Sequence, residues 1–233
     1  ARETAARVAA GAIAKLLLNE LNIDVRSGIC EIDGVKADNF NFENARNSEI
    51  FALDSNVEDA QKNAILKAKN SHNSVGGVAL INVKNCPVGL GEPIYHKLDA
   101  QIANAMMSIN AVKAVEIGDG ILASRVLGFD NNDQIRKSGF KTNHSGGILG
   151  GISNGDDINV KVYFKATPSI FIEQETVDIY GNEVECKLKG RHDPCVAIRG
   201  SVVAESMIAL VIADMLLLNM SSKVENIKKV YAK

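Results

Sequence analysis

The segment VVAESMIALVIADMLLL, residues 202–218, decides the fold because it is apolar on almost every side of a helix. Only Glu205, Ser206 and Asp214 interrupt its apolar residues. A helix that is apolar around most of its circumference is stable in water only when other elements cover most of it. The segment therefore predicts a central helix enclosed by the rest of the chain.

Alternation of apolar and other residues predicts the strands next to this helix. Ile158, Val160, Val162 and Phe164 share one face of a strand. Residues 170–177 and 184–188 read as two further strands joined by a turn at 180–182, which together predict a β-meander.

The first half of the chain mixes helices and strands. Its opening residues follow an amphipathic helical stripe, Ala5, Val8, Ala9, Ala12, Ile13, Leu16 and Leu17. Strands are predicted at 25–32, 49–53 and 76–83, and helices at 55–69 and 98–107. No capping residue precedes the first helix, so we expect a segment upstream of it.

These elements predict an α+β fold with helices layered between antiparallel sheets. A weak similarity between residues 15–19 and 215–219, each at the end of a long helix, suggests two related halves. We expect residues 1–219 to form the core. Residues 220–233 are rich in Ser, Lys and Asn, and we expect them to form a loosely held tail.

The composition argues against nucleic-acid binding and a membrane location. The chain has 26 basic and 28 acidic residues and a formal net charge of −2, so an anion site must come from a local cluster. The longest uninterrupted apolar run, residues 207–213, is shorter than the roughly 18 residues of a membrane span.

Cysteine and histidine spacing argues against a metal site. No pair has the C-x-x-C spacing, and the residues are scattered along the chain: Cys30, Cys86, Cys186, Cys195, His72, His96, His144 and His192. We expect reduced, partly buried thiols and a reducing compartment.

Three loop segments carry the candidate chemistry, and each has a structural alternative. The glycine run at 146–155 has neither P-loop nor dinucleotide-binding spacing, so it forms either tight turns or a backbone amide cradle. Residues 165–169, Lys-Ala-Thr-Pro-Ser, end a strand with one ammonium and two hydroxyls, which suit phosphate, although Lys165 also reads as a solvated edge lysine. Arg191 and Asp193 in the segment 190–195 either brace their loop as an ion pair or hold an anion beside a proton-transfer group.

Together these segments resemble chorismate synthase of the bacterial type, a flavin-dependent lyase family, from the first residue to about Leu218. The resemblance implies a β-α-β sandwich with pseudo-twofold halves, a cytoplasmic homotetramer built as a dimer of dimers, and reduced FMN as cofactor. The implied reaction converts 5-enolpyruvylshikimate 3-phosphate to chorismate and phosphate by 1,4-elimination without net redox change.

The resemblance also assigns site residues one by one. It implies that Asp193 is the acid near flavin N5 and that Arg2 and Arg191 bind substrate. The residues it implies for the flavin are Asn110, Ala111, Gly150, Lys165, Ala166, Thr167, Pro168, Ser169 and Arg191.

The chain departs from the family pattern in two respects. Ala166 stands where the family usually has Pro, which should loosen the loop without removing a ligand. The family's Gly-Glu-Ser-His-Gly motif, a second histidine and several substrate arginines have no counterpart here, so we expect the chain alone to be inactive. The alternatives are a noncatalytic flavin- or phosphate-binding module and a flavoprotein oxidoreductase.

Overall fold

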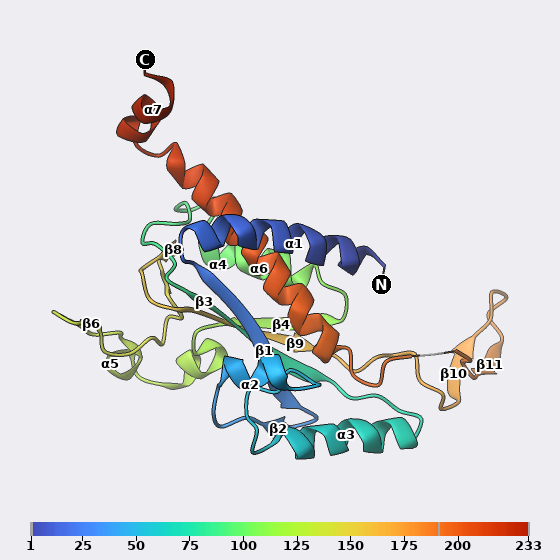
Figure 1. Ribbon diagram of the computed structural model, residues 1–233. Coiled ribbons are helices and arrows are strands. Elements are labelled where there is room, and N and C mark those ends of the chain that lie inside the picture. The colour runs from blue at the N-terminus through green and yellow to red at the C-terminus, as the bar shows by residue number, and fades with distance from the viewer. Residues whose placement is uncertain (1, 191, 233) are drawn as a thin grey trace.

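A computed structural model describes residues 2–190 and 192–232 and has the expected α+β class (Figure 1). Its main sheet is fully antiparallel, with the strand order β2-β1-β3-β9-β4. The strands are β1 (Asp24–Ile32), β2 (Val35–Lys36), β3 (Gly77–Lys84), β4 (Val112–Ile117) and β9 (Ile158–Phe164). Strand β9 buries every second side chain, as its alternation predicts.

Helix α6 (Ala197–Met220) is the predicted central helix. It packs against α1 (Glu3–Glu20), against strands β1, β3 and β9, and against α4 (Leu98–Met107). By length and composition α6 could cross a membrane, but half of its most apolar 18-residue window is buried inside the protein. The contacts of α6 with the sheet and with α1 make it a core helix.

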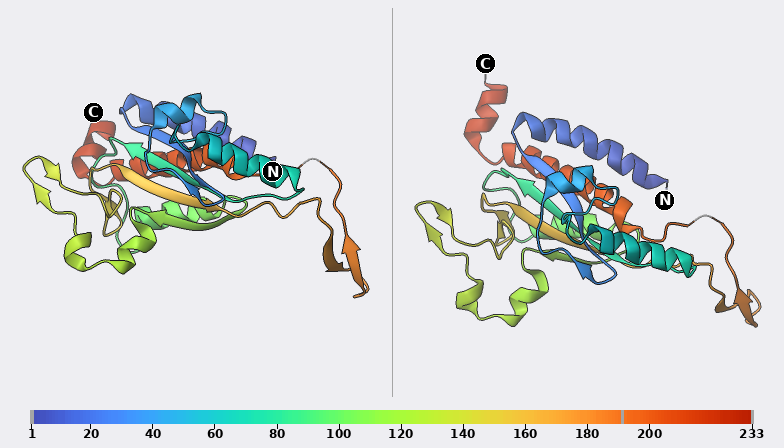
Figure 2. Two further views of the ribbon diagram at one scale, coloured as in Figure 1. Left: turned by 90° about the horizontal axis from the view of Figure 1, so that it is seen from below. Right: turned by 60° about the horizontal axis from the view of Figure 1, so that its bottom comes forward.

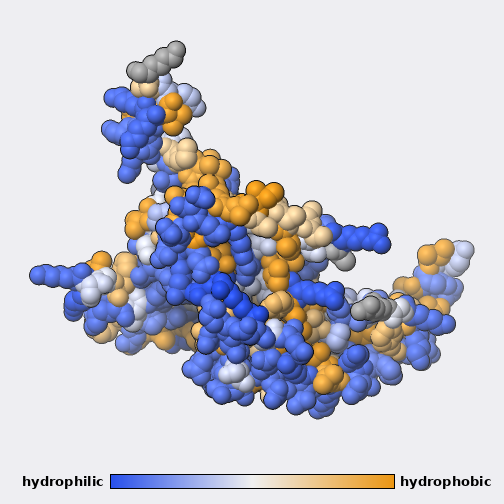
Figure 3. All heavy atoms as spheres, viewed as in Figure 1, coloured by the Kyte–Doolittle hydropathy of each residue, from blue (hydrophilic) through white to orange (hydrophobic). Residues whose placement is uncertain are grey.

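Helix α1 packs through a face that its apolar pattern does not predict. The buried residues are Gly11, Ala14 and Leu18, whereas Ile13 and Leu16 of the predicted stripe are 70% and 66% exposed. A Cβ atom on Gly11 would lie 2.4 Å from the Cβ of Ser206 on α6. Small residues therefore set a close crossing with α6, and the larger apolar residues contribute to the apolar patch seen in Figure 3.

The opposite face of the sheet is covered by the segment that contains α2 (Phe42–Asn47). Its small core consists of Cys30, Ala45, Leu53, Val78 and Leu80. The predicted strand at 49–53 is wrong, because only an isolated bridge joins Ala52 to Ile29. Helix α3 (Glu58–Asn70) follows and confirms the predicted helix at 55–69, although it begins three residues later than predicted.

The predicted β-meander is also wrong, because β9 lies between β3 and β4 and does not pair with the strands that follow it. Strands β10 (Gln174–Val177) and β11 (Glu183–Cys186) form a separate hairpin. The other short elements are η1 (Gly120–Arg125), α5 (Gly128–Asn131), β5 (Ile135–Arg136), β6 (Gly139–Phe140), β7 (Ile148–Leu149) and β8 (Ile152–Ser153). The tail contains helix α7 (Val224–Tyr231), which the polar composition of the segment does not predict.

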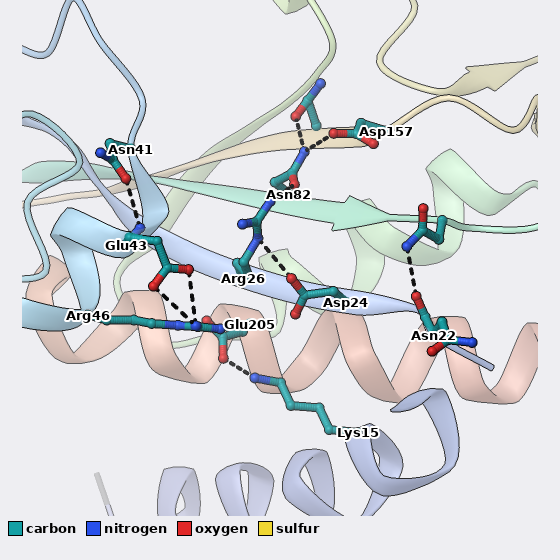
Figure 4. Close-up of polar contacts among 12 residues, drawn as sticks. Lys15, Asn22, Asp24, Arg26, Asn41, Glu43, Arg46, Asn82, Asp157 and Glu205 are labelled. Atoms are coloured by element: carbon teal, nitrogen blue, oxygen red, sulfur yellow. Dashed lines mark hydrogen bonds and ion pairs between the residues drawn. The ribbon is translucent and has the colours of Figure 1, made fainter. Parts of the chain in front are cut away.

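A polar network lies beside β1 (Figure 4). Lys15 of α1 pairs with Glu205 of α6. The Nε atom of Arg26 lies 3.1 Å from a carboxylate oxygen of Asp24, and a guanidinium NH₂ group of Arg26 donates to the Asn82 side-chain oxygen at 3.3 Å. One contact joins α1 to α6, and another joins β1 to β3.

The close crossing of α1 and α6 predicts that Gly11→Ala destabilises the protein. Alanine is the better helix former, so the substitution would stabilise an uncrowded helix. Here the added methyl collides with Ser206, and we expect a loss of about 1–3 kcal/mol in the free energy of unfolding. Chemical denaturation measures it. Gly128→Ala, where no atom lies within 4 Å of the new Cβ, is the matched control, and an equal effect of both substitutions would contradict the crossing.

Candidate functional site

The loop that follows β9 begins beside the start of β4. The backbone amide of Lys165 donates to the carbonyl oxygen of Ala111 at 2.9 Å, which holds the two segments together. Ala111 has φ +71°, a left-handed conformation that is costly for alanine and is often found at functional sites. The Asn110 side-chain amide donates to Glu3 at 3.3 Å, so the neighbouring Arg2 lies near the same corner of the sheet.

A cavity of about 440 Å³ opens beside this loop. Its walls come from the C-terminal end of α3, the loop after β9 and the segment before α6. The lining residues are Lys69, His72, Asn73, Ser74, Ser169, Phe171, Gly190, His192, Asp193 and Pro194. Two of the predicted site residues, Ser169 and Asp193, therefore face one cavity although 24 positions separate them in the sequence.

Hydrogen bonds join the three cavity walls. The Ser74 hydroxyl donates to the Thr167 carbonyl oxygen at 2.6 Å, and the amide of Phe171 donates to the His72 carbonyl oxygen at 3.1 Å. The amide of Val75 donates to the Pro194 carbonyl oxygen at 2.8 Å. The α3–β3 loop is thus the common anchor for the other two walls.

Two buried polar atoms in this region have no hydrogen-bond partner among the described residues. They are the hydroxyl oxygen of Thr167 and Nε2 of His192. A buried polar group without a partner costs about 1–3 kcal/mol, and such a group is often kept because a ligand uses it. Both atoms are therefore candidates for ligand contact, and the Thr167 hydroxyl belongs to the predicted phosphate-binding segment.

The charges around the cavity are only partly neutralised. Asp193 lies 3.4 Å from Arg199 in the first turn of α6, and both side chains are substantially exposed. Within the described residues, no carboxylate lies within 4.0 Å of the ammonium of Lys69, which lines the cavity. The same holds for Lys165, which precedes the cavity loop and is not among the lining residues. Free ammonium groups beside hydroxyls suit an anionic ligand.

Arg191 falls outside the described residues, so its predicted roles are not placed. Asp193, the partner predicted for Arg191 in a structural ion pair, lies 3.4 Å from Arg199. Ala166 and Pro168 are exposed on the loop after β9, next to the cavity residue Ser169.

The glycine run at 146–155 contains both tightly packed and open positions. A Cβ on Gly146 would lie 2.3 Å from the backbone nitrogen of Gly118, so that turn needs glycine for its packing. Gly150 has φ +62° and no atom within 4 Å of an added Cβ, which leaves room for a ligand. It lies in the β7–β8 turn before β9, whereas Lys165 follows β9, so about 20 Å of strand separates them. The structure does not bring Gly150 to the cavity.

Sequence reasoning missed most residues of the α3–β3 wall. Lys69, His72 and Ser74 lie at a helix end that reads as an ordinary stop signal. Phe171 lies between two histidine rings, with centroid distances of 6.3 Å to His72 and 5.5 Å to His192. Of these residues, only His192 could have been predicted from the sequence, because it is adjacent to the predicted site residue Asp193.

A second cavity, of about 470 Å³, lies between α1, β1, α2 and α6. Its lining includes Lys15, Arg26 and Arg46, yet each is already paired with a carboxylate, of Glu205, Asp24 and Glu43 respectively. Because these three cations already have carboxylate partners, this cavity is the weaker candidate for binding an anion.

The cysteines are free, as predicted. Burial raises the pKa of Cys30 to about 12 and that of Cys86 to about 11, so both remain thiols at neutral pH. The described ranges contain no cluster of three metal-ligating side chains.

Comparisons with known proteins show which family the chain resembles. Residues 1–217 match the family described as chorismate synthase. The chain is 83% identical to a chorismate synthase of Aliarcobacter butzleri (strain RM4018) and 64% identical to one of Sulfurimonas denitrificans (strain ATCC 33889 / DSM 1251), in each case over all 233 of its residues and 65% of the relative.

A solved structure, "Crystal Structure of Chorismate Synthase", matches with a TM-score of 0.79 and 33% identity. That match covers 98% of this chain and 67% of the solved chain. The chain thus spans about 65% of the length of the curated relatives that it matches. A family match over nearly the whole sequence and a shared fold lead to one conclusion: the chain belongs to the chorismate synthase family.

Proposed function

We propose that this chain forms the greater part of a chorismate synthase, which eliminates phosphate from 5-enolpyruvylshikimate 3-phosphate to give chorismate. The observation that carries the proposal is the convergence of three loops on the 440 Å³ cavity, where Ser169, Asp193 and Lys69 meet. Family membership supports the same reaction. The proposal includes a cytoplasmic homotetramer built as a dimer of dimers.

The residues around the cavity fit reduced FMN, whose phosphate is anionic and whose ring carries polar edges. The unpartnered hydroxyl of Thr167 can donate to a phosphate oxygen. Lys165 and Ser169, each two positions away in the sequence, offer a cation and a second hydroxyl. Asn110 and Ala111 lie next to Lys165 through the bond between the backbones of Ala111 and Lys165. The remaining proposed contacts are Ala166, Pro168 and Arg191. Gly150, which the resemblance implies for the flavin, lies at the other end of β9 from this cavity.

Reduced FMN, when bound, supplies an electron-rich ring that assists loss of phosphate and receives the ring proton. The chain's own residues provide position and charge. We assign Asp193 to proton movement beside the flavin, because a carboxylate at the cavity wall can exchange a proton without changing the fold. Arg2 and Arg191 are assigned to the substrate, whose departing phosphate needs cationic partners.

A second candidate function is a noncatalytic flavin- or phosphate-binding module. It is favoured by the unpartnered Thr167 hydroxyl and by the Lys69 ammonium at the cavity wall, which suit binding of an anion whether or not a reaction follows. Flavin titration together with a chorismate assay separates the two functions. Binding without turnover supports the module, whereas turnover without net consumption of reductant supports the lyase.

The assignment of Asp193 predicts that Asp193→Asn in the complete enzyme slows turnover by about 10²- to 10⁴-fold and leaves flavin affinity nearly unchanged. Asparagine keeps the shape of the side chain and loses its proton-transfer capacity. Single-turnover kinetics measure the effect.

Arg199→Gln is the matched control for Asp193, because it breaks the same 3.4 Å contact from the other side. If Asp193 only braces the start of α6, both substitutions should have the same small effect on rate. Equal rates for the two variants would return Asp193 to a structural role.

The buried hydroxyl of Thr167 yields a prediction with opposite signs in two measurements. Thr167→Val removes a buried polar atom without a partner, so the ligand-free protein should become equally or more stable. The same change should weaken flavin binding about tenfold, the loss expected for one hydrogen bond to a charged group. Thermal unfolding and flavin titration test both signs, with the exposed Thr176→Val as control. Unchanged flavin affinity would remove Thr167 from the site.

A further inference from the structure

The β10–β11 hairpin projects from the body without support from the rest of the described chain (Figure 2). Its two strands pair only with each other, and every residue of both strands is exposed. An isolated two-stranded hairpin is marginally stable in water. At its turn, Ile179 and Tyr180 are 91% and 82% exposed. The hairpin therefore has a surface that gains stability from a partner.

One face of the hairpin is acidic. Glu175 lies directly opposite Glu185, and Val177 lies opposite Glu183 on the same face. Like charges opposite each other destabilise a strand pair, so cations placed over this face would relieve the repulsion. The segment 173–187 carries five acidic residues and one lysine, which makes a basic partner the favoured one.

Helix α7 has the complementary chemistry. None of its residues is buried. Val224, Ile227 and Tyr231 recur at helical spacing and form an apolar stripe, and Lys228 lies one turn after Val224 on the same side. The segment 223–231 carries three lysines and one acidic residue. The apolar stripe of α7 can pack on Val177, and its lysines can pair with the glutamates on the same face of the hairpin.

The two surfaces lie at opposite ends of the molecule in all three views of the ribbon (Figures 1 and 2). A hairpin therefore cannot reach the α7 helix of its own chain, but it can reach that of another copy. A twofold axis between two copies would place each hairpin on the other copy's α7, so that both contacts form at once and the assembly closes.

We propose that two copies of this chain associate by docking the Glu175, Glu183 and Glu185 face of each β10–β11 hairpin on helix α7 of the other copy. This contact is independent of the proposed reaction, since none of these residues lines the cavity of the candidate site. Loss of flavin binding would leave it intact.

Cysteine cross-linking tests the contact directly. In a Cys186→Ser background, one sample carries Val177→Cys and a second carries Ile227→Cys. Mixed under mild oxidation, they should form a disulfide-linked heterodimer at least about fivefold faster than a mixture in which Thr176→Cys, on the opposite face, replaces Val177→Cys. Equal rates from the two faces, or no heterodimer, would overturn the proposal.

A chain carrying both Val177→Cys and Ile227→Cys tests the symmetry. The expected product on a non-reducing gel is a covalent dimer. A cross-linked monomer would show that the hairpin reaches its own α7, and a ladder of larger species would indicate an open head-to-tail chain. Either result would overturn the twofold contact.

Charge reversal provides an independent test that needs no cysteine. Glu175→Lys with Glu185→Lys should weaken self-association by about fivefold or more, as should Lys228→Glu with Lys229→Glu, and an equimolar mixture of the two variants should recover association. Lys137→Glu, on the exposed β5–β6 turn, is the control. Light scattering measures association and circular dichroism checks folding. Failure of the mixture to recover would contradict the pairing.

Discussion

The rest of the structure depends on the burial of helix α6 against the sheet and α1. Gly200 of α6 lies so close to Phe164 that an added Cβ would be 2.4 Å from the Phe164 ring. Gly77 of β3 meets Ala197, the first residue of α6, in the same way, at 2.9 Å between the added Cβ and the alanine Cβ. These contacts fix the start of α6 over the end of β9 and the beginning of β3. The segment 192–196 must therefore pass beside the loop that follows β9, which creates the cavity.

The sequence predicted those elements whose burial is simple. Strand β9 is buried on one face and α6 on most sides, and both patterns were visible in the order of apolar residues. The predicted helix at 98–107 is also confirmed, because its buried apolar residues pack against two elements, α6 and β4. Where the buried side of an element follows the periodicity of its apolar residues, that periodicity is enough to predict the element.

The failures have physical causes that single-sequence patterns do not contain. Helix α1 buries Gly11 and Ala14 and exposes Ile13, because close approach to Ser206 outweighed the area of the larger side chains. The strands after β9 pair with each other, since β4, more than forty residues earlier, already occupies the free edge of β9. Long-range pairing of this kind leaves no local signal.

The candidate site was predicted in part. The loop at 165–169 and Asp193 were identified from their chemistry and from family resemblance, and the structure brings Ser169 and Asp193 to one cavity. The α3–β3 wall was missed, because Lys69, His72 and Ser74 belong to a polar helix end whose neighbours are set by tertiary folding. The resemblance implies a flavin contact for Gly150, yet the length of β9 separates this residue from the cavity.

The central claim is that the loops at 72–75, 165–171 and 192–194 form one ligand site at the end of β9. Amide hydrogen exchange of the complete protein, with and without reduced FMN, tests it most directly. The account predicts that the flavin slows exchange in all three loops together, including the amides of Val75 and Phe171. Slowed exchange confined to the cavity between α1, β1, α2 and α6, with no change in these three loops, would contradict it.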